Sequence, residues 1–233
     1  MSSYHIQNLE EYFKAYREAR EQPEKFWASV ASENFLWRKK WDTVLQWDFT
    51  KPEVKWFEGA TLNITENCID RHLENRGDKT AILFEPNDPD EAAQHITYRQ
   101  LHEQVCRFAN VLKDKGIKKG DRVCIYLPMI PELAYAVLAC ARIGAIHSVV
   151  FAGFSATALS TRINDSECKM VITSDGSFRV AKSIDLKGIV DEALKDCSCV
   201  KNVLIAERIG SDITYKEERD HRLQPLLDAA DPQ

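Results

Sequence analysis

Apolar residues recur along the chain with two spacings, and the change between them divides the sequence into two stretches. In the first stretch, which ends near residue 59, helical spacing predicts an amphipathic helix over residues 9–20. The predicted apolar face of this helix holds Leu9, Tyr12, Phe13 and Tyr16. The rest of the first stretch carries few strand signals, so we expect a helical or irregular arm there.

From Thr65 onward, short apolar runs alternate with helical patterns. The apolar runs predict strands at residues 80–85, 123–127, 146–151, 170–173 and 200–206, with a short extended segment at 95–97. The helical patterns predict helices at residues 66–75, 98–115, 131–143, 156–164 and 186–195. This alternation indicates an α/β fold, with a mainly parallel sheet flanked by helices on both faces.

Residues at the ends of the predicted helices support these boundaries. Thr65 and Ser155 are expected to cap the helices that follow them. Thr97 and Gln100 form the T-x-x-Q pattern of a capping box. The helix over residues 131–143 opens with a proline and ends before a glycine. It is apolar nearly all round, so we expect it to be buried.

The pattern weakens after residue 207. The remaining sequence is polar and charged, with one short apolar patch at residues 223–227. The chain stops at Asp-Pro-Gln without a predicted closing strand or helix. We therefore expect a truncated end, or one that lies in the middle of a longer protein.

The first stretch is rich in tryptophan. Its aromatic residues include all five tryptophans of the chain, at positions 27, 37, 41, 47 and 56. Such an arm could be a platform for a ligand, or a clasp packed on the rest of the protein. The clasp is favoured because large aromatic side chains mostly serve burial. The predicted domains are therefore an arm, residues 1–59, packed on an α/β body, residues 60–233.

Charge and composition narrow the classes of function. The formal net charge of -5 argues against a general affinity for nucleic acid or anionic lipid. We find neither a signal peptide nor an apolar run long enough to cross a bilayer. The odd number of cysteines, and the apolar runs around Cys106, Cys124 and Cys140, indicate reduced core thiols and a cytoplasmic protein. The histidines are scattered, so we expect no metal site.

Residues that could bind a ligand follow two of the predicted strands. After the strand that ends at Phe151 comes a short turn with Gly153 and Phe154, and then a helix start that would favour an anion. After the strand that ends at residue 173 come Arg179 and Lys182. Because these strands are consecutive, we expect them to be neighbours whose loops meet at one edge of the sheet. The alternative is that both cations are ordinary solvated surface charges.

Three stretches carry a resemblance to a known family. GIKKGDRVCIYLPMIPELAYAVLACARIGAIHSVVFAGFS resembles the AMP-forming acyl-coenzyme A synthetases. The tryptophan-rich arm with VKWFEGATLNITENCIDRHL, and NDSECKMVITSDGSFRVAKSIDLK, are similar to the acetyl-coenzyme A synthetases within that family. The resemblance covers nearly the whole chain. It implies a reaction in which acetate and ATP give acetyl-AMP and pyrophosphate, after which coenzyme A takes the acetyl group.

The resemblance also implies where coenzyme A binds. In the family, an F-G-G-F loop and an R-x-x-R segment hold the adenosine 3′,5′-diphosphate end of coenzyme A. Phe151, Gly153 and Phe154 match the loop, and Arg179 matches the first arginine. Lys182 stands where the family has the second arginine, and it lacks the planar fork that grips a phosphate. Residue 152 is an alanine in place of a glycine.

Several parts of the family's active site have no counterpart in the sequence. The Ser/Thr/Gly-rich phosphate loop with its lysine is absent, as are the residues that the family uses for the ribose, the acetate pocket and the C-terminal lid. We therefore assign no catalytic residue and no ATP or Mg²⁺ site to this chain. We expect the N-terminal portion of an acetyl-coenzyme A synthetase, inactive alone, whose small-molecule partners are acetate, ATP and coenzyme A.

Two other hypotheses remain open. A free-standing nucleotide-binding module would need a complete phosphate-cradling loop such as G-x-G-x-x-G after a strand, and the sequence has none. A non-catalytic interaction protein is supported only by the tryptophan-rich arm.

Overall fold

The computed structural model describes residues 6–179 and 182–233. Its contacts divide the chain into two compact units, Met1–Cys68 and Ile69–Gln233. The division falls at Cys68, beyond the boundary near residue 59 that the composition indicated. That the arm packs on the body stays a prediction.

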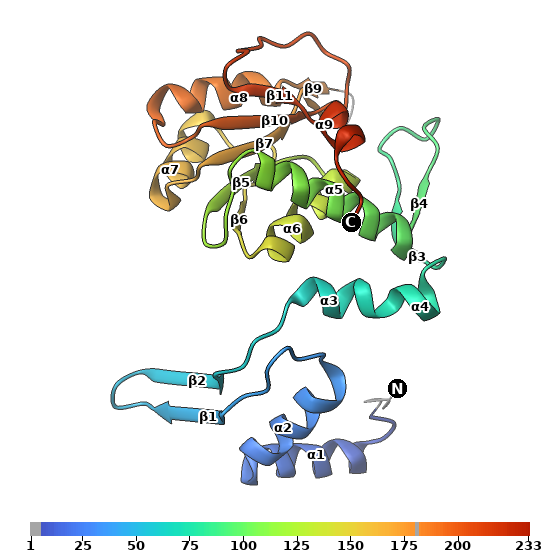
Figure 1. The fold of residues 1–233 in the computed structure, drawn as a ribbon, viewed down its shortest axis with the longest axis vertical. Helices are drawn as coiled ribbons and strands as arrows, with labels where there is room; N and C mark the ends of the chain where they lie inside the picture. Colours follow the sequence, from blue (N-terminus) through green and yellow to red (C-terminus); the bar gives the residue numbers. More distant parts are fainter. Residues whose placement is uncertain (1–5, 180–181) are drawn as a thin grey trace. The chain divides into compact units, whose positions relative to one another are not determined.

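The first unit contains more regular structure than its sequence suggested (blue in Figure 1). Its elements are α1 (Leu9–Glu21), α2 (Pro23–Asn34), β1 (Thr43–Asp48), β2 (Glu53–Glu58) and α3 (Ile64–Cys68). Helix α1 forms as predicted, and the Asn8 side chain caps it by accepting a hydrogen bond from the Glu11 amide at 2.9 Å. The antiparallel hairpin of β1 and β2 was not predicted.

Aromatic side chains pack against one another within the first unit. The Trp37 ring lies 5.3 Å from the ring of Trp41 and 5.6 Å from that of Phe57, between centroids. The rings of Trp27 and Trp56 meet edge to face at 6.2 Å. The hairpin was not predicted because its two strands mix aliphatic, aromatic and charged residues without strict alternation, and such strands depend on cross-strand packing.

The helix predicted over residues 66–75 is wrong in its boundaries. The structure has α3, a 3₁₀ turn η1 (Asp70–His72) and α4 (Leu73–Arg76) in its place. The residue that caps α3 is Asn63, whose side-chain oxygen accepts from the Thr65 amide at 2.9 Å. Thr65 itself therefore lies inside the helix.

The second unit is built on a five-stranded parallel sheet (Figure 1). Its strands are β5 (Arg122–Tyr126), β6 (Ile146–Val149), β7 (Met170–Ser174), β10 (Asn202–Ala206) and β11 (Asp220–Arg222), in the order β11-β10-β7-β5-β6. The helices are α5 (Tyr98–Asp114), α6 (Pro131–Ile143), α7 (Ala156–Ser166), α8 (Leu186–Ala193) and α9 (Leu223–Ala229), and a 3₁₀ turn η2 (Leu194–Asp196) follows α8. Two small hairpins complete the unit, β3 (Thr80–Phe84) with β4 (Gln94–Thr97) and β8 (Ser177–Arg179) with β9 (Lys182–Ile184).

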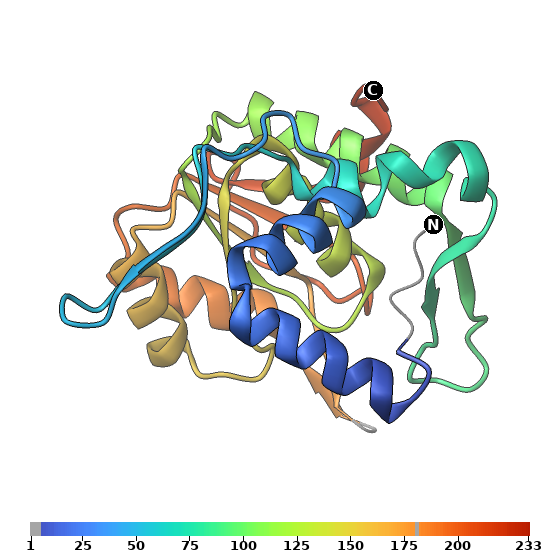
Figure 2. The same ribbon diagram turned by 90° about the horizontal axis from the view of Figure 1, so that it is seen from below.

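Alternate residues of the central strands enter different cores, as the pleat of a strand requires. Val123 and Ile125 pack in the core that α5, α6 and α9 cover. Cys124 and Tyr126, from the same strand, pack in the core that α7 and α8 cover. Figure 2 shows green α5 and gold and orange α7 and α8 on opposite sides of the sheet. The predicted α/β fold with helices on both faces is confirmed.

Several local predictions are also confirmed. Thr97 and Gln100 form both hydrogen bonds of the capping box. Gly144 ends α6 in the left-handed conformation, with φ 74°. Cys106, Cys124 and Cys140 are all buried. Burial raises the pKa of the Cys140 thiol to about 12, so this thiol stays protonated and unreactive.

The expectation that α6 is buried holds in part: no residue of α6 is exposed, but Leu133, Val137 and Leu138 are only partly buried against the core. The expectation that no closing element follows residue 207 is wrong. The segment after residue 207 does form regular structure, β11 and α9. The short apolar patch supplies the buried Leu223 and Leu227 of α9, while β11 is too short and polar to show a strand pattern.

The strand order corrects the expected position of the candidate loops. β5 lies between β6 and β7, so these two consecutive strands are not neighbours. In chain order the sheet reads 2-1-3-4-5, and the chain reverses its direction across the sheet between β5 and β7. In such sheets ligands bind beyond the carboxyl ends of the strands at this reversal.

Candidate functional site

A cavity of about 790 Å³ opens at the carboxyl edge of the sheet. Its walls come from the segments that follow β3, β5 and β6, from the β8–β9 hairpin and from the turn after β10. Aromatic, aliphatic and guanidinium groups line it; they include Phe84, Leu127, Met129, Phe151, Phe178, Arg179 and Arg208. Mostly apolar walls with a few placed polar groups are typical of sites for small molecules.

The turn between β6 and α7 supplies one wall of this cavity. Phe151 lines the cavity with 68% of its surface exposed. The Phe154 amide donates to the Phe151 carbonyl at 3.1 Å and closes the turn. The buried Tyr126 hydroxyl then donates to the Phe154 carbonyl at 2.8 Å. Burial raises the pKa of Tyr126, so this hydroxyl keeps its proton and remains a donor.

Gly153 is needed for a close approach. A Cβ atom at this position would lie 3.0 Å from the Phe151 ring, so glycine leaves room for that ring beside the turn. The centroids of the Phe154 and Phe151 rings lie 6.0 Å apart. The guanidinium carbon of Arg162, on α7, lies 4.9 Å from the centroid of the Phe154 ring. Phe154 thus supports the turn through α7, while Phe151 faces the cavity.

Arg179 and Lys182 are paired across the β8–β9 hairpin, and both are exposed. Arg179 lines the cavity together with Phe151, although β5 separates β6 from β7. Lys182, Gly153 and Phe154 are not among the lining residues. The structure therefore brings one of the candidate residues from each loop, Phe151 and Arg179, into one cavity.

Sequence reasoning missed Asp175 and Arg208, which follow β7 and β10 at this edge. Asp175, directly after β7, is fully buried, and its carboxylate accepts backbone amides of Arg208, Ile209 and Ser211 at 2.7 to 3.2 Å. These bonds hold the turn after β10 against β7. An aspartate at the end of a buried strand was the available signal, but its partners lie 33 to 36 residues further along the chain.

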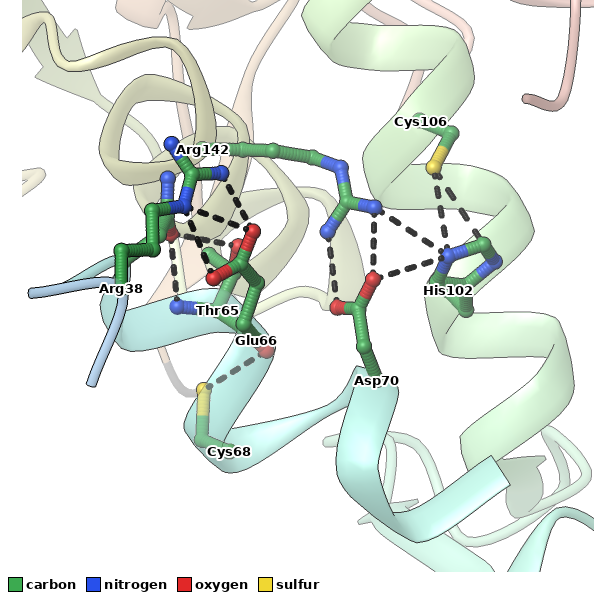
Figure 3. Close-up of polar contacts among 9 residues, drawn as sticks. Arg38, Thr65, Glu66, Cys68, Asp70, His102, Cys106 and Arg142 are labelled. Carbon is green, nitrogen blue, oxygen red and sulfur yellow. Dashed lines mark hydrogen bonds and ion pairs between the residues drawn. The ribbon is translucent and has the colours of Figure 1, made fainter. Parts of the chain in front are cut away.

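A second polar cluster lies away from this cavity, between η1, α5 and α6 (Figure 3). Arg142 donates two hydrogen bonds of 2.8 Å to the Asp70 carboxylate, and it also lies 3.2 Å from Nε2 of His102. The Cys106 sulfur lies 3.6 Å from the same nitrogen. Burial raises the pKa of Cys106. These contacts join η1, α5 and α6, and the raised pKa of Cys106 disfavours its thiolate form.

Among the residues that the structure describes, no helix is both long enough and apolar enough to cross a membrane.

Two family models match the chain. The model described as "AMP-binding enzyme" matches residues 69–232, and the model described as "Acetyl-coenzyme A synthetase N-terminus" matches residues 12–68. The boundary between the two matches coincides with the division between the two compact units.

Curated relatives and a solved structure match along most of the chain. The acetyl-coenzyme A synthetase of Alkalilimnicola ehrlichii is 53% identical over 90% of this chain and 32% of the relative. Acetyl-coenzyme A synthetase 2 of Pseudomonas aeruginosa is 52% identical over 96% of this chain and 34% of the relative. The chain thus spans about a third of the length of these curated relatives. An acetoacetyl-CoA synthetase from Streptomyces lividans superimposes with a TM-score of 0.82 and 28% identity, covering 92% of this chain and 32% of that one.

Proposed function

The chain belongs to the AMP-binding enzyme family, and we propose on that premise that it forms part of an AMP-forming acetate–coenzyme A ligase. In the first step an acetate oxygen attacks the α-phosphorus of ATP, and pyrophosphate leaves. In the second step the coenzyme A sulfur attacks the acetyl carbonyl carbon, the thiol proton is lost, and AMP leaves with the bonding electrons. The identity to acetyl-coenzyme A synthetases supports acetate as the acid.

The contribution of this chain is a site for the nucleotide end of coenzyme A. One observation carries this proposal: Phe151 and Arg179, from two separate loops, line the same cavity at the carboxyl edge of the sheet. Phe151 offers an exposed ring to the adenine, and Arg179 offers a guanidinium fork to a phosphate. Gly153 and Phe154 shape the turn, and Lys182 adds a positive charge on the same hairpin.

The remaining parts of the reaction are assigned to residues outside this chain. The sequence has no Ser/Thr/Gly-rich phosphate loop, and such loops supply the electrostatic stabilisation of phosphoryl transfer. The ATP and Mg²⁺ sites would therefore lie elsewhere, and this chain alone would be inactive.

Acetate-dependent exchange between ATP and labelled pyrophosphate tests this division of roles. The longer Pseudomonas aeruginosa relative serves as the positive control. We expect exchange by that relative and none above background by this chain. Exchange by a pure sample of this chain would contradict the proposal.

A further inference from the structure

One ion pair connects the loop between β3 and β4 to the turn after β10. Nη1 and Nη2 of Arg208 donate to Oε1 and Oε2 of Glu91 at 2.8 and 2.9 Å. The two side chains are 17% and 35% exposed. Two parallel hydrogen bonds between a guanidinium and a carboxylate fix the relative orientation of the two groups as well as their separation. The pair therefore holds two segments together that lie 117 residues apart in sequence.

The Arg208 side of this pair is fixed to the sheet. The buried Asp175 carboxylate accepts the Arg208 amide at 2.7 Å. Gly176 follows, and a Cβ there would lie 2.8 Å from the Ile184 carbonyl, so the backbone is closely packed at this point. The turn after β10 is thus anchored to the end of β7, and the Arg208 guanidinium projects from this anchored turn.

The Glu91 side belongs to a loop that forms a wall of the cavity. Glu85, Pro86 and Asn87 of this loop line the cavity. The Arg208 guanidinium carbon also lies 5.8 Å from the ring centroid of Phe84 and 5.9 Å from that of Phe178, two further lining residues. The ion pair therefore lies where the loop meets the rest of the wall.

Arg208 could instead be a ligand for phosphate, since it lines the cavity. Its electrostatic surroundings argue against this. Both of its terminal nitrogens already donate to Glu91, so a phosphate would have to displace that carboxylate. Arg179 is exposed on the β8–β9 hairpin and is better placed for that task.

We propose that the Glu91–Arg208 ion pair is a latch that holds the loop of residues 85–93 in place as a wall of the cavity. Both residues are positioning residues, and neither contacts the ligand's phosphates. The ligand's identity rests on the proposed coenzyme A site, whereas the latch itself rests on the contacts described above.

Hydrogen exchange tests the latch without any ligand. The amides of residues 90 and 91 donate to Asp88 within the loop. In the full chain, Glu91→Gln and Arg208→Gln should each speed exchange of these two amides by at least about tenfold, because the loop opens more often. Asp90→Asn removes a charge from the same loop outside the ion pair, and it should leave these rates unchanged. The double variant Glu91→Arg with Arg208→Glu swaps the two charges, and it should slow hydrogen exchange again. Unchanged rates in Glu91→Gln would overturn the proposal, even if an Arg208 variant failed to fold.

Titration with coenzyme A then tests the effect on the site. We expect Glu91→Gln and Arg208→Gln to raise the dissociation constant several-fold, and the double variant to be no weaker than either single one. Tighter binding by Glu91→Gln would show that Glu91 competes with the ligand for Arg208, which contradicts the latch. If the unaltered chain bound no coenzyme A, the proposed site would fail, while the exchange rates would still decide the latch.

Discussion

The hydroxyl of Tyr126 donates a hydrogen bond of 2.8 Å to the backbone carbonyl of Phe154. Tyr126 ends β5, which lies beside β6, and Phe154 lies in the turn that follows β6. One side chain from the neighbouring strand thus fixes the turn that presents Phe151 to the cavity. The Tyr126 ring is fully buried, so its hydroxyl is held in place to make this bond.

Removal of this hydroxyl should weaken the turn while preserving the core. We expect Tyr126→Phe to lower the free energy of unfolding by about 0.5–1.5 kcal/mol, the net contribution of one intramolecular hydrogen bond. It should also weaken coenzyme A binding. Urea denaturation and calorimetric titration measure the two effects. Tyr135→Phe, in the core on the other face of the sheet, is the control. Equal coenzyme A binding by Tyr126→Phe and the unaltered chain would argue against this role.

Arg179 should contribute more to coenzyme A binding than Lys182, because Arg179 lines the cavity. Arg179→Ala should raise the dissociation constant at least about tenfold, the size expected for a charge-assisted hydrogen bond. Lys182→Arg should tighten binding slightly by restoring a planar fork. Lys201→Ala removes an exposed charge just before β10, at the opposite edge of the sheet, and should have no effect. An unchanged dissociation constant for Arg179→Ala would refute the assignment.

A buried network of ion pairs at the β11 edge of the sheet should make the free energy of unfolding depend on pH. Nζ of Lys187 lies 2.7 Å from Asp191 and 2.8 Å from Asp220, and the side chains of Lys187 and Asp220 are 1% and 0% exposed. Burial opposes ionisation of Asp220, but hydrogen bonds from Arg219 and Lys187 outweigh it and lower the pKa of Asp220. We expect Asp220→Asn to lower the free energy of unfolding by about 3–5 kcal/mol near neutral pH.

The pH dependence follows from the direction of this shift. A carboxylate with a lowered pKa in the folded state contributes stability above the ordinary aspartate pKa of about 4. That stability is lost as the pH falls further, through the lower pKa of the folded state. Urea denaturation between pH 7 and pH 2 should therefore show a steeper loss below about pH 4 for the unaltered chain than for Asp220→Asn. Asp228→Asn, on the exposed side of α9, should follow the unaltered chain.

The α/β body could be predicted from the sequence because its signals are local. The strands around Val123 and Met170 are short apolar runs, and the capping box of Thr97 and Gln100 marks a helix start by itself. The order of the strands could not be predicted in the same way. Consecutive strands usually lie side by side, but β7 lies beyond β5, and only packing of the whole sheet determines this order.

The candidate site was predictable only in part, for the same reason. Phe151 and Arg179 were found from their positions after predicted strands, the family resemblance assigned them to coenzyme A, and both line one cavity in the structure. The roles of Asp175 and Arg208 could not be predicted, since their partners come from distant segments. The β1–β2 hairpin was missed because neither strand alternates strictly between apolar and polar residues: Leu45 follows Val44, and Phe57 follows Trp56.

The central claim is that the carboxyl-edge cavity binds the nucleotide end of coenzyme A. Titration of the isotope-labelled chain with adenosine 3′,5′-bisphosphate, followed by amide chemical shifts, tests it most directly and tolerates weak binding. We predict saturable shifts for the amides of residues 151–154 and 177–179, and their loss in Arg179→Ala. Shifts confined to other parts of the chain, or the same shifts in Arg179→Ala, would contradict this account.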